Sequence, residues 1–302
     1  MTPIDLSSTT LRKGSAIATL SAISYGSAVI FVRYAQQAGV SPETVAFLRY
    51  AIASLILLLF LGLSGRWTKL PFGRAAILFL LGLTAYTIMG LTWVIAFSIT
   101  PAWLVSLVVA LYPLTVTVGS WLFLRERIYA QQVLALGSVL LGGVILFWRP
   151  FEGAAWSGIF LMLFNVLIST TYVLVGQRWT RGLPPTVSTI WLIAGAMVGT
   201  FLYGLLFNQL SFAFAPAGWI WVTLFATVST VLAVTMLWWG IGLIGPSRVA
   251  ILGSFEPLFS ILLAVLILGE RLFPSQIVGG VFILMGMVLV QWTPRARGGG
   301  EG

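Results

Sequence analysis

Long apolar stretches alternate with short polar or turn-forming ones along the whole chain of 302 residues. A helix needs about 20 apolar residues to cross a bilayer core of about 30 Å. Ten stretches meet this requirement, and Arg, Glu, Pro and Gly residues punctuate the connections between them. The pattern therefore predicts an all-α, polytopic membrane protein with spans at residues 14–35, 43–64, 74–98, 101–124, 130–149, 155–179, 187–208, 216–243, 246–268 and 274–293.

The composition supports this reading, because 59% of the residues are hydrophobic and only 8% are charged. Soluble domains carry about 25% charged residues, which they need to cover their surface. Ten helices of this size leave no connection long enough for a folded extramembrane domain, so we expect any function to reside inside the bundle. The first apolar run is too long for a signal peptide and lacks a cleavage site, so it should remain as the first span.

The basic residues predict the orientation of the chain. Although the net charge is +9, Lys and Arg lie scattered at the ends of apolar runs, which argues against a nucleic-acid partner and follows the positive-inside bias. One side of the predicted bundle holds twelve of them and the opposite side three, so both termini should be cytoplasmic. The twelve are Arg12, Lys13, Arg66, Lys69, Arg74, Arg125, Arg127, Arg178, Arg181, Arg248, Arg295 and Arg297, and the three are Arg33, Arg149 and Arg271.

The second half of the sequence repeats the first at an offset of 144 residues. Glu126-Arg127 corresponds to Glu270-Arg271, and Pro113 corresponds to Pro257. Because each half has an odd number of helices, the second half must insert upside down relative to the first. The sequence therefore predicts two inverted five-helix repeats, residues 1–149 and 150–302, an arrangement typical of secondary transporters that alternate access around a midplane site.

These residues resemble a known family. The run from Gly253 to Phe259, the segment Leu266 to Arg271 and the counterpart from Tyr112 to Arg127 resemble the ten-helix, EamA-type branch of the drug/metabolite transporter superfamily. Within it, the aromatic-rich chain is most similar to bacterial exporters of aromatic and neutral amino acids. The resemblance implies an inner-membrane carrier that moves small metabolites out of the cytoplasm.

Three residues in the interiors of the predicted spans are candidates for the transport mechanism. Glu256 is the only acidic residue predicted deep within a span, so it should face a partner or a wet cavity. Its carboxyl group either takes part in transport, as a solute contact or a proton-linked switch, or has a structural role. Pro113 and Pro257 interrupt helices 4 and 9 at equivalent positions, and should free the carbonyls of Val109 and Gly253. Paired interruptions mark a transport site, although simple bending for packing is the alternative.

Aromatic and neutral polar side chains share helix faces in several spans, and such walls suit an amphipathic, mostly uncharged solute. Interfacial belts and helix packing are the alternative explanations for these residue types. With Glu256 included, the predicted solute-binding residues are Tyr25, Tyr86, Trp93, Trp103, Tyr112, Asn165, Ser169, Tyr172, Trp238 and Glu256.

Three arginines near helix ends, Arg33, Arg49 and Arg248, have two interpretations. Their side chains either snorkel to the interface or, best for Arg248 and Arg49, bind a solute carboxylate. Glycines such as Gly142 and Gly279 should let helices 5 and 10 approach closely and support the bundle without lining the pathway.

Other functional classes fit the residues less well. An intramembrane enzyme would need paired acids, a Ser–His couple or a metal set, and the chain has no His, no Cys and a single Asp outside the spans. No phosphate-binding glycine motif occurs, and we expect no cofactor. A channel, a carrier of phosphorylated solutes and a proton-coupled multidrug or cation exporter remain as alternatives. The expected partners are a small solute and the lipid bilayer, and the oligomeric state stays open.

Overall fold

The computed structural model describes residues 8–65, 68, 70–99, 108–109, 111–146, 156–268 and 273–291. Every regular element in this part of the chain is helical. The elements of the first half are α1 (Ser8–Gly26), α2 (Ala28–Gln37), α3 (Pro42–Leu63), α4 (Phe72–Leu81), the π-helical turn η1 (Gly82–Tyr86), α5 (Thr87–Ile99), α7 (Tyr112–Leu124) and α8 (Ala130–Leu146). Those of the second are α9 (Trp156–Thr180), α10 (Pro185–Leu206), α11 (Ala217–Ala226), the π-helical turn η2 (Thr227–Leu232), α12 (Ala233–Ile244), α13 (Pro246–Gly253), α14 (Phe255–Leu268) and α15 (Pro274–Gln291).

The predicted all-α membrane architecture is confirmed. Within the described residues, seven continuous or gently interrupted helices are long and apolar enough to cross a membrane, and three shorter apolar helices, α7, α8 and α15, accompany them. Where both are described, their ends lie within two residues of the predicted ones, except that the first span begins at Ser8, six residues before its predicted start. Residues 101–107 and 110 of the fourth predicted span lie outside the described part.

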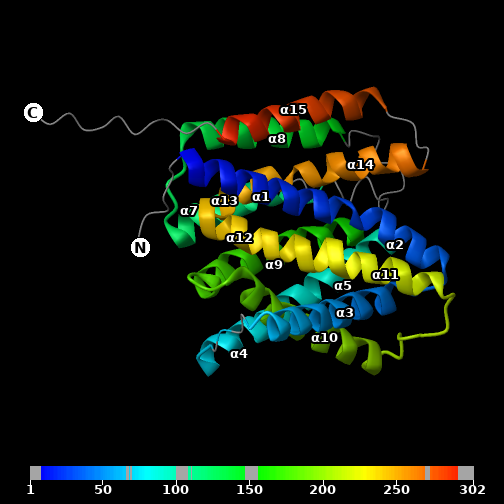
Figure 1. The fold of residues 1–302 in the computed structure, drawn as a ribbon. Coiled ribbons are helices and arrows are strands. Elements are labelled where there is room, and N and C mark those ends of the chain that lie inside the picture. The colour runs from blue at the N-terminus through cyan, green and yellow to red at the C-terminus, as the bar shows by residue number, and fades with distance from the viewer. Residues whose placement is uncertain are drawn as a thin grey trace, which may run out of the picture.

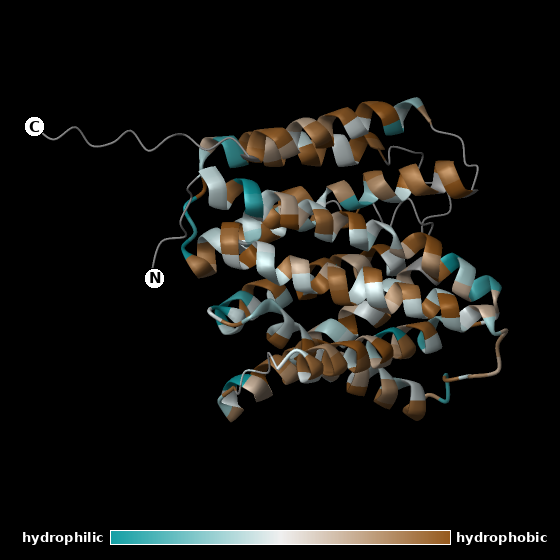
Figure 2. Cartoon of the chain, in the orientation of Figure 1, coloured by the Kyte–Doolittle hydropathy of each residue, from teal (hydrophilic) through white to brown (hydrophobic). Residues whose placement is uncertain are grey.

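The helices run roughly side by side in one bundle (Figure 1). The beginning of α1 and the end of α15 lie at the same end of the bundle, as an even number of crossings requires. Hydrophobic residues cover the helices along their length, while hydrophilic ones gather at the helix ends (Figure 2). The outer surface therefore suits lipid, and the two ends suit the aqueous interfaces.

The contact between α8 and α15 shows how the two halves are related. A Cβ added at Gly142 would lie 2.6 Å from the carbonyl oxygen of Gly279, and one added at Gly286 would lie 2.7 Å from that of Ala135. These pairs exchange under the 144-residue offset, and Ser138, which donates a 2.6 Å hydrogen bond to the carbonyl of Phe282, faces its own equivalent. The order of the contacts makes α8 and α15 antiparallel. Equivalent helices thus run in opposite directions, as an inverted repeat requires.

Each half also carries a π-helical turn in its third span, which the sequence pattern did not predict. η1 and η2 overlap when the 144-residue offset is applied. Thr87 donates to the carbonyl of Gly82 at 3.1 Å, and Thr230 donates to that of Phe225 at 3.2 Å, each five residues back. Such turns leave backbone groups to be satisfied by side chains and are frequent at functional sites.

Candidate functional site

Pro113 and Pro257, which the sequence predicts in the middle of spans, both lie at the start of a helix. The ninth span divides at Ser254, where α13 ends and α14 begins, and Pro257 lies in the first turn of α14. In the fourth span α7 begins at Tyr112, with Pro113 in its first turn. The missing N–H of a proline is harmless in a first turn, so neither residue removes a hydrogen bond from the interior of α7 or α14, in contrast to the mid-helix position that the sequence predicts. The interruptions place Glu256 and Tyr112, which are equivalent residues, just before a proline.

Glu256 lies where α14 meets α1. A Cβ added at Gly26 would lie 2.8 Å from the carbonyl oxygen of Glu256, and Ser260 donates a 3.1 Å hydrogen bond to the carbonyl of Gly26. As a residue, Glu256 is exposed. Tyr25 directly precedes Gly26 on α1, and the charge of Glu256 acts on both Tyr25 and Tyr112. Three of the predicted site residues are therefore neighbours.

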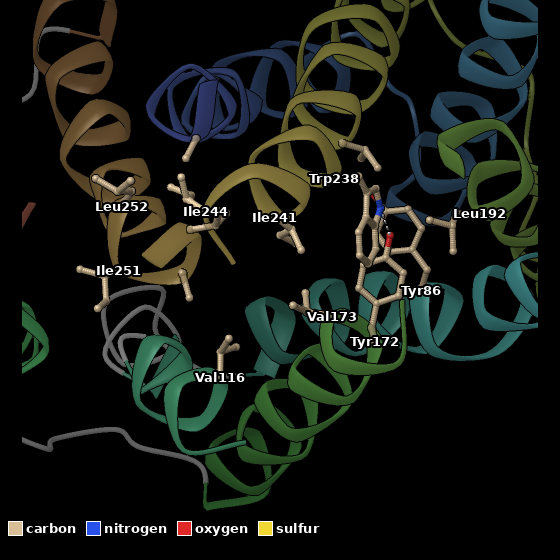
Figure 3. Packing of buried hydrophobic residues seen from close by; sticks show 14 of the residues in the cluster. Tyr86, Val116, Tyr172, Val173, Leu192, Trp238, Ile241, Ile244, Ile251 and Leu252 are labelled. Atoms are coloured by element: carbon tan, nitrogen blue, oxygen red, sulfur yellow. Dashed lines mark hydrogen bonds between the residues drawn. The ribbon is translucent and has the colours of Figure 1, made fainter. Parts of the chain in front are cut away.

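Four rings from different spans form a continuous aromatic row, which we define as Tyr50, Tyr86, Tyr172 and Trp238. Ring centroids are 5.2 Å apart for Tyr50 and Tyr86, 5.1 Å for Tyr86 and Tyr172, and 5.3 Å for Tyr172 and Trp238. The indole N–H of Trp238 donates to the Tyr172 hydroxyl at 3.3 Å, as Figure 3 shows. Tyr25 joins the row through the hydroxyl of Tyr86. The structure thus brings Tyr25, Tyr86, Tyr172 and Trp238 together.

Asn165 and Ser169 are engaged in contacts between helices. The Asn165 amide donates to the carbonyl of Met89 at 2.8 Å and to the hydroxyl of Thr92 at 2.7 Å, and Ser169 donates to the Asn165 oxygen at 3.3 Å. These bonds tie α9 to α5 and use the groups that a solute would otherwise contact. A role of either residue in solute binding stays a prediction.

The other two aromatic candidates lie apart from the row or beyond description. Trp93 is 37% exposed, two turns along α5 from the end of η1. Trp103 lies outside the described residues. Their roles remain predictions.

Arg49 and Tyr50 were absent from the predicted solute-binding set, although Arg49 had been weighed as a carboxylate partner. Arg49 lies in the second turn of α3, and its guanidinium donates to the Tyr50 hydroxyl and lies 4.2 Å from the Tyr50 ring centroid. Its position near a helix end favoured snorkelling in the sequence, but the helix face on which it lies points into the bundle. The adjacent tyrosine was the signal that could have identified it.

At the end of the bundle where α1 begins, the two halves are joined by a polar contact. Ser247 at the start of α13 donates a 2.9 Å hydrogen bond to the Glu126 carboxylate beyond the end of α7. Burial raises the pKa of Glu126 above its ordinary value of 4.5, and the Ser247 bond and the Arg248 charge offset only part of this effect. Arg248 is 4% exposed, with its guanidinium carbon 5.6 Å from the centre of the Tyr129 ring. The Arg248 side chain is therefore packed inside this end of the bundle and does not snorkel to water.

Comparisons with known proteins agree with the repeat. The profile of the EamA-like transporter family matches residues 12–148 and again residues 156–292, an offset of 144 at both ends. An uncharacterized transporter of Archaeoglobus fulgidus is 26% identical over 283 residues, covering 93% of this chain and 97% of its own length. Protein PecM of Dickeya dadantii is 26% identical over 260 residues, covering 83% of each chain.

A solved crystal structure matches the fold with a TM-score of 0.78 at 17% identity, covering 92% of this chain and 98% of its own. Such a match speaks for the fold alone. The two profile matches together cover nearly the whole chain, one for each half of the bundle. The protein is a multi-pass membrane protein that belongs to the EamA-like transporter family.

Proposed function

We propose that the protein is a secondary transporter that exports aromatic or neutral amino acids across the bacterial inner membrane by alternating access, with both termini cytoplasmic. The observation that carries the proposal is the pair of interrupted helices at equivalent positions, which presents Glu256 and Tyr112 beside the aromatic row. In inverted-repeat carriers, discontinuous helices at the repeat interface form the solute site.

The chemistry of the surrounding side chains supports an amphipathic solute. The rings of Tyr86, Tyr172 and Trp238 offer large apolar surfaces with hydroxyl and indole groups at their edges. Glu256 is an accessible carboxylate in the same neighbourhood, and a solute ammonium is its natural partner. Transport of a solute without an apolar portion would leave the aromatic surface without a function.

Unequal burial of equivalent helices supports alternating access. Seven of the eight residues of α13 are buried, whereas no residue of α14 whose side chain is described is buried. In contrast α7, the equivalent of α14, buries five residues. In this proposal the end of the bundle with α7 and α13 is the closed one, and the hydrogen bond between Ser247 and Glu126 belongs to that closure. In this proposal the repeats 1–149 and 150–302 move relative to each other, and this bond breaks when the cytoplasmic end opens.

The test is counterflow with purified protein in liposomes that are preloaded with unlabelled L-phenylalanine. Labelled phenylalanine should accumulate transiently and with saturation, and unlabelled tyrosine or tryptophan outside should compete. Glu256→Gln should reduce this exchange, while Glu43→Gln, at the exposed start of α3, is the matched control. Exchange of phosphorylated solutes in place of amino acids would overturn the substrate class, and flux that does not saturate would overturn the carrier mechanism.

A proton-coupled exporter of cationic drugs is the second candidate, and it rests on Glu256 as well. Among the described residues no basic side chain forms an ion pair with this carboxylate, so a proton or a solute cation could neutralise it. An imposed pH gradient distinguishes the two functions. It should drive accumulation of a lipophilic cation in the second case and leave the exchange of phenylalanine unchanged in the first.

A further inference from the structure

Arg49 is an arginine that faces the interior of the bundle. Its guanidinium carbon lies 4.2 Å from the ring centroid of Tyr50 and 5.1 Å from that of Phe225 on α11. A Cβ added at Gly90 on α5 would lie 3.5 Å from its Nη2 atom. Tyr25 on α1 and Tyr86 on η1 also act on its charge. Because side chains from these other helices surround it, the guanidinium is shielded from lipid.

The hydrogen-bonding capacity of Arg49 is only partly used. A guanidinium has five N–H donors. In the described part of the chain one of its terminal nitrogens donates to the Tyr50 hydroxyl, while the Nε atom is buried without an acceptor. The groups that act on its charge are the phenols of Tyr50, Tyr86 and Tyr25, not a carboxylate. An Arg at membrane depth is costly and is usually retained for a function. The cation–π contacts with Tyr50 and Phe225 offset part of that cost but neutralise none of the charge.

The position of Arg49 relates it to the solute-binding region. Arg49 on α3 contacts Tyr50, the first ring of the aromatic row. Glu256 on α14 lies against Gly26, the residue that follows Tyr25 on α1. The cation and the anion thus come from different helices. Under the 144-residue offset the equivalent of Arg49 is Ile193, which is 0% exposed. The second half therefore has no second cation at this level, and the site has one positive and one negative group.

We propose that Arg49 binds the carboxylate of the transported solute while Glu256 receives its ammonium group, so that the site selects zwitterions. This inference rests on the proposed amino-acid transport. A paired Arg and Glu leave the loaded site neutral when the solute is itself neutral overall. A phosphorylated solute would carry close to two negative charges against a single arginine. The geometry thus accounts for a preference for α-amino acids over both simple amines and phosphorylated compounds.

The experiment measures binding and transport separately with three related probes. L-Phenylalanine carries both charges, 3-phenylpropionate carries only the carboxylate, and phenethylamine carries only the ammonium. Binding is read as ligand-dependent thermal stabilisation of the purified protein in detergent, and transport as counterflow in liposomes. The variants are Arg49→Gln and Arg49→Lys, with Arg33→Gln on α2 as an arginine control that is exposed.

Arg49→Gln should lower the binding affinity for phenylalanine and phenylpropionate about 10- to 100-fold, the equivalent of a lost hydrogen bond to a charged group. The affinity for phenethylamine should stay unchanged. Arg49→Lys should lower the affinity for these two carboxylate-bearing probes less, because lysine keeps the positive charge but lacks the paired donors of the planar guanidinium. If Arg49→Gln fails to fold, Arg49→Lys alone decides. Equal loss of all three probes, or unchanged affinity for the carboxylates, would overturn the inference. Carboxylate binding that depends on Arg49 without any counterflow would instead sustain the inference and refute the proposed transport.

Discussion

Gly176 on α9 offers a sharp test of how tightly the aromatic row is packed. A Cβ added there would lie 2.0 Å from Cη2 of Trp238, with two further indole carbons at 2.8 and 2.9 Å. An ordinary carbon–carbon contact is about 3.5 Å, so in Gly176→Ala the tip of the indole must retreat by about 1.5 Å. Trp238 is 3% exposed and has little free space into which to move.

The magnitude follows from the contacts that this movement breaks. The 3.3 Å hydrogen bond from Trp238 to Tyr172 would lengthen beyond bonding distance, at about 1 kcal/mol. The edge-on contact of the same rings is worth about 0.5–1.5 kcal/mol. Alanine regains up to about 1 kcal/mol of helix propensity. Overpacking strain of about 1–3 kcal/mol adds to the loss, and we expect Gly176→Ala to destabilise the protein by about 1.5–4.5 kcal/mol.

Unfolding in mixed micelles, followed by circular dichroism, measures this difference. Gly242→Ala is the matched control, because it lies on the same helix as Trp238 and an added Cβ meets nothing within 4 Å. A double-mutant cycle identifies the cause: in a Trp238→Leu background the effect of Gly176→Ala should largely vanish. An undiminished effect in that background would show that the indole is not what the new methyl group meets.

Three further predictions concern other parts of the bundle. Gly279→Leu should separate α15 from α8, because the glycine's Cβ would lie 2.6 Å from a backbone oxygen; the yield of monodisperse protein should fall, and Gly137→Leu should leave it unchanged. Pro257→Ala should let α13 and α14 join, slowing counterflow at normal folding yield; undiminished exchange would contradict a role for the interruption. Glu126 has a raised pKa, so its contribution to stability is present at low pH and is lost as the pH rises through that value. Thermal scans from about pH 4 to about pH 8 should therefore show wild type losing stability relative to Glu126→Gln, and parallel curves would refute this.

The helices could be predicted from the sequence because a bilayer fixes their length and the punctuating residues fix their ends. The third span was expected at 74–98, and the structure has Phe72–Ile99 including η1. The π-helical turns could not be predicted, because they depend on how the third span meets its neighbours and their residues, such as Thr-Val-Ser-Thr in η2, also fit an α-helix. The break between α1 and α2 at Ser27 was missed for the same reason.

The candidate site was partly accessible from sequence. Residue type and periodicity identified Tyr86, Tyr172 and Trp238, which lie together. Asn165 has the same kind of signal, yet its amide bonds to α5. A polar side chain on a buried helix face can meet either a solute or a neighbouring helix, and only the tertiary contacts distinguish the two. The same ambiguity hid Arg49, whose depth depends on the angle at which α3 enters the bundle.

The two repeats share a helix arrangement, but the side chains at equivalent positions of the proposed site differ. The shape of the solute gives a physical reason for this difference. In the proposed mechanism, the structural similarity of the two halves would let the bundle open at either end by the same kind of movement. A solute with a carboxylate, an ammonium and a side chain has no twofold symmetry of its own. A site formed of identical halves would bind it in two orientations with equal affinity. In this chain Glu256 corresponds to Tyr112, and Arg49 to Ile193, so every charged group of the proposed site has an uncharged counterpart. Opposite charges on opposite repeats would hold the solute in one orientation and would also pull the two repeats together around it, which couples binding to closure.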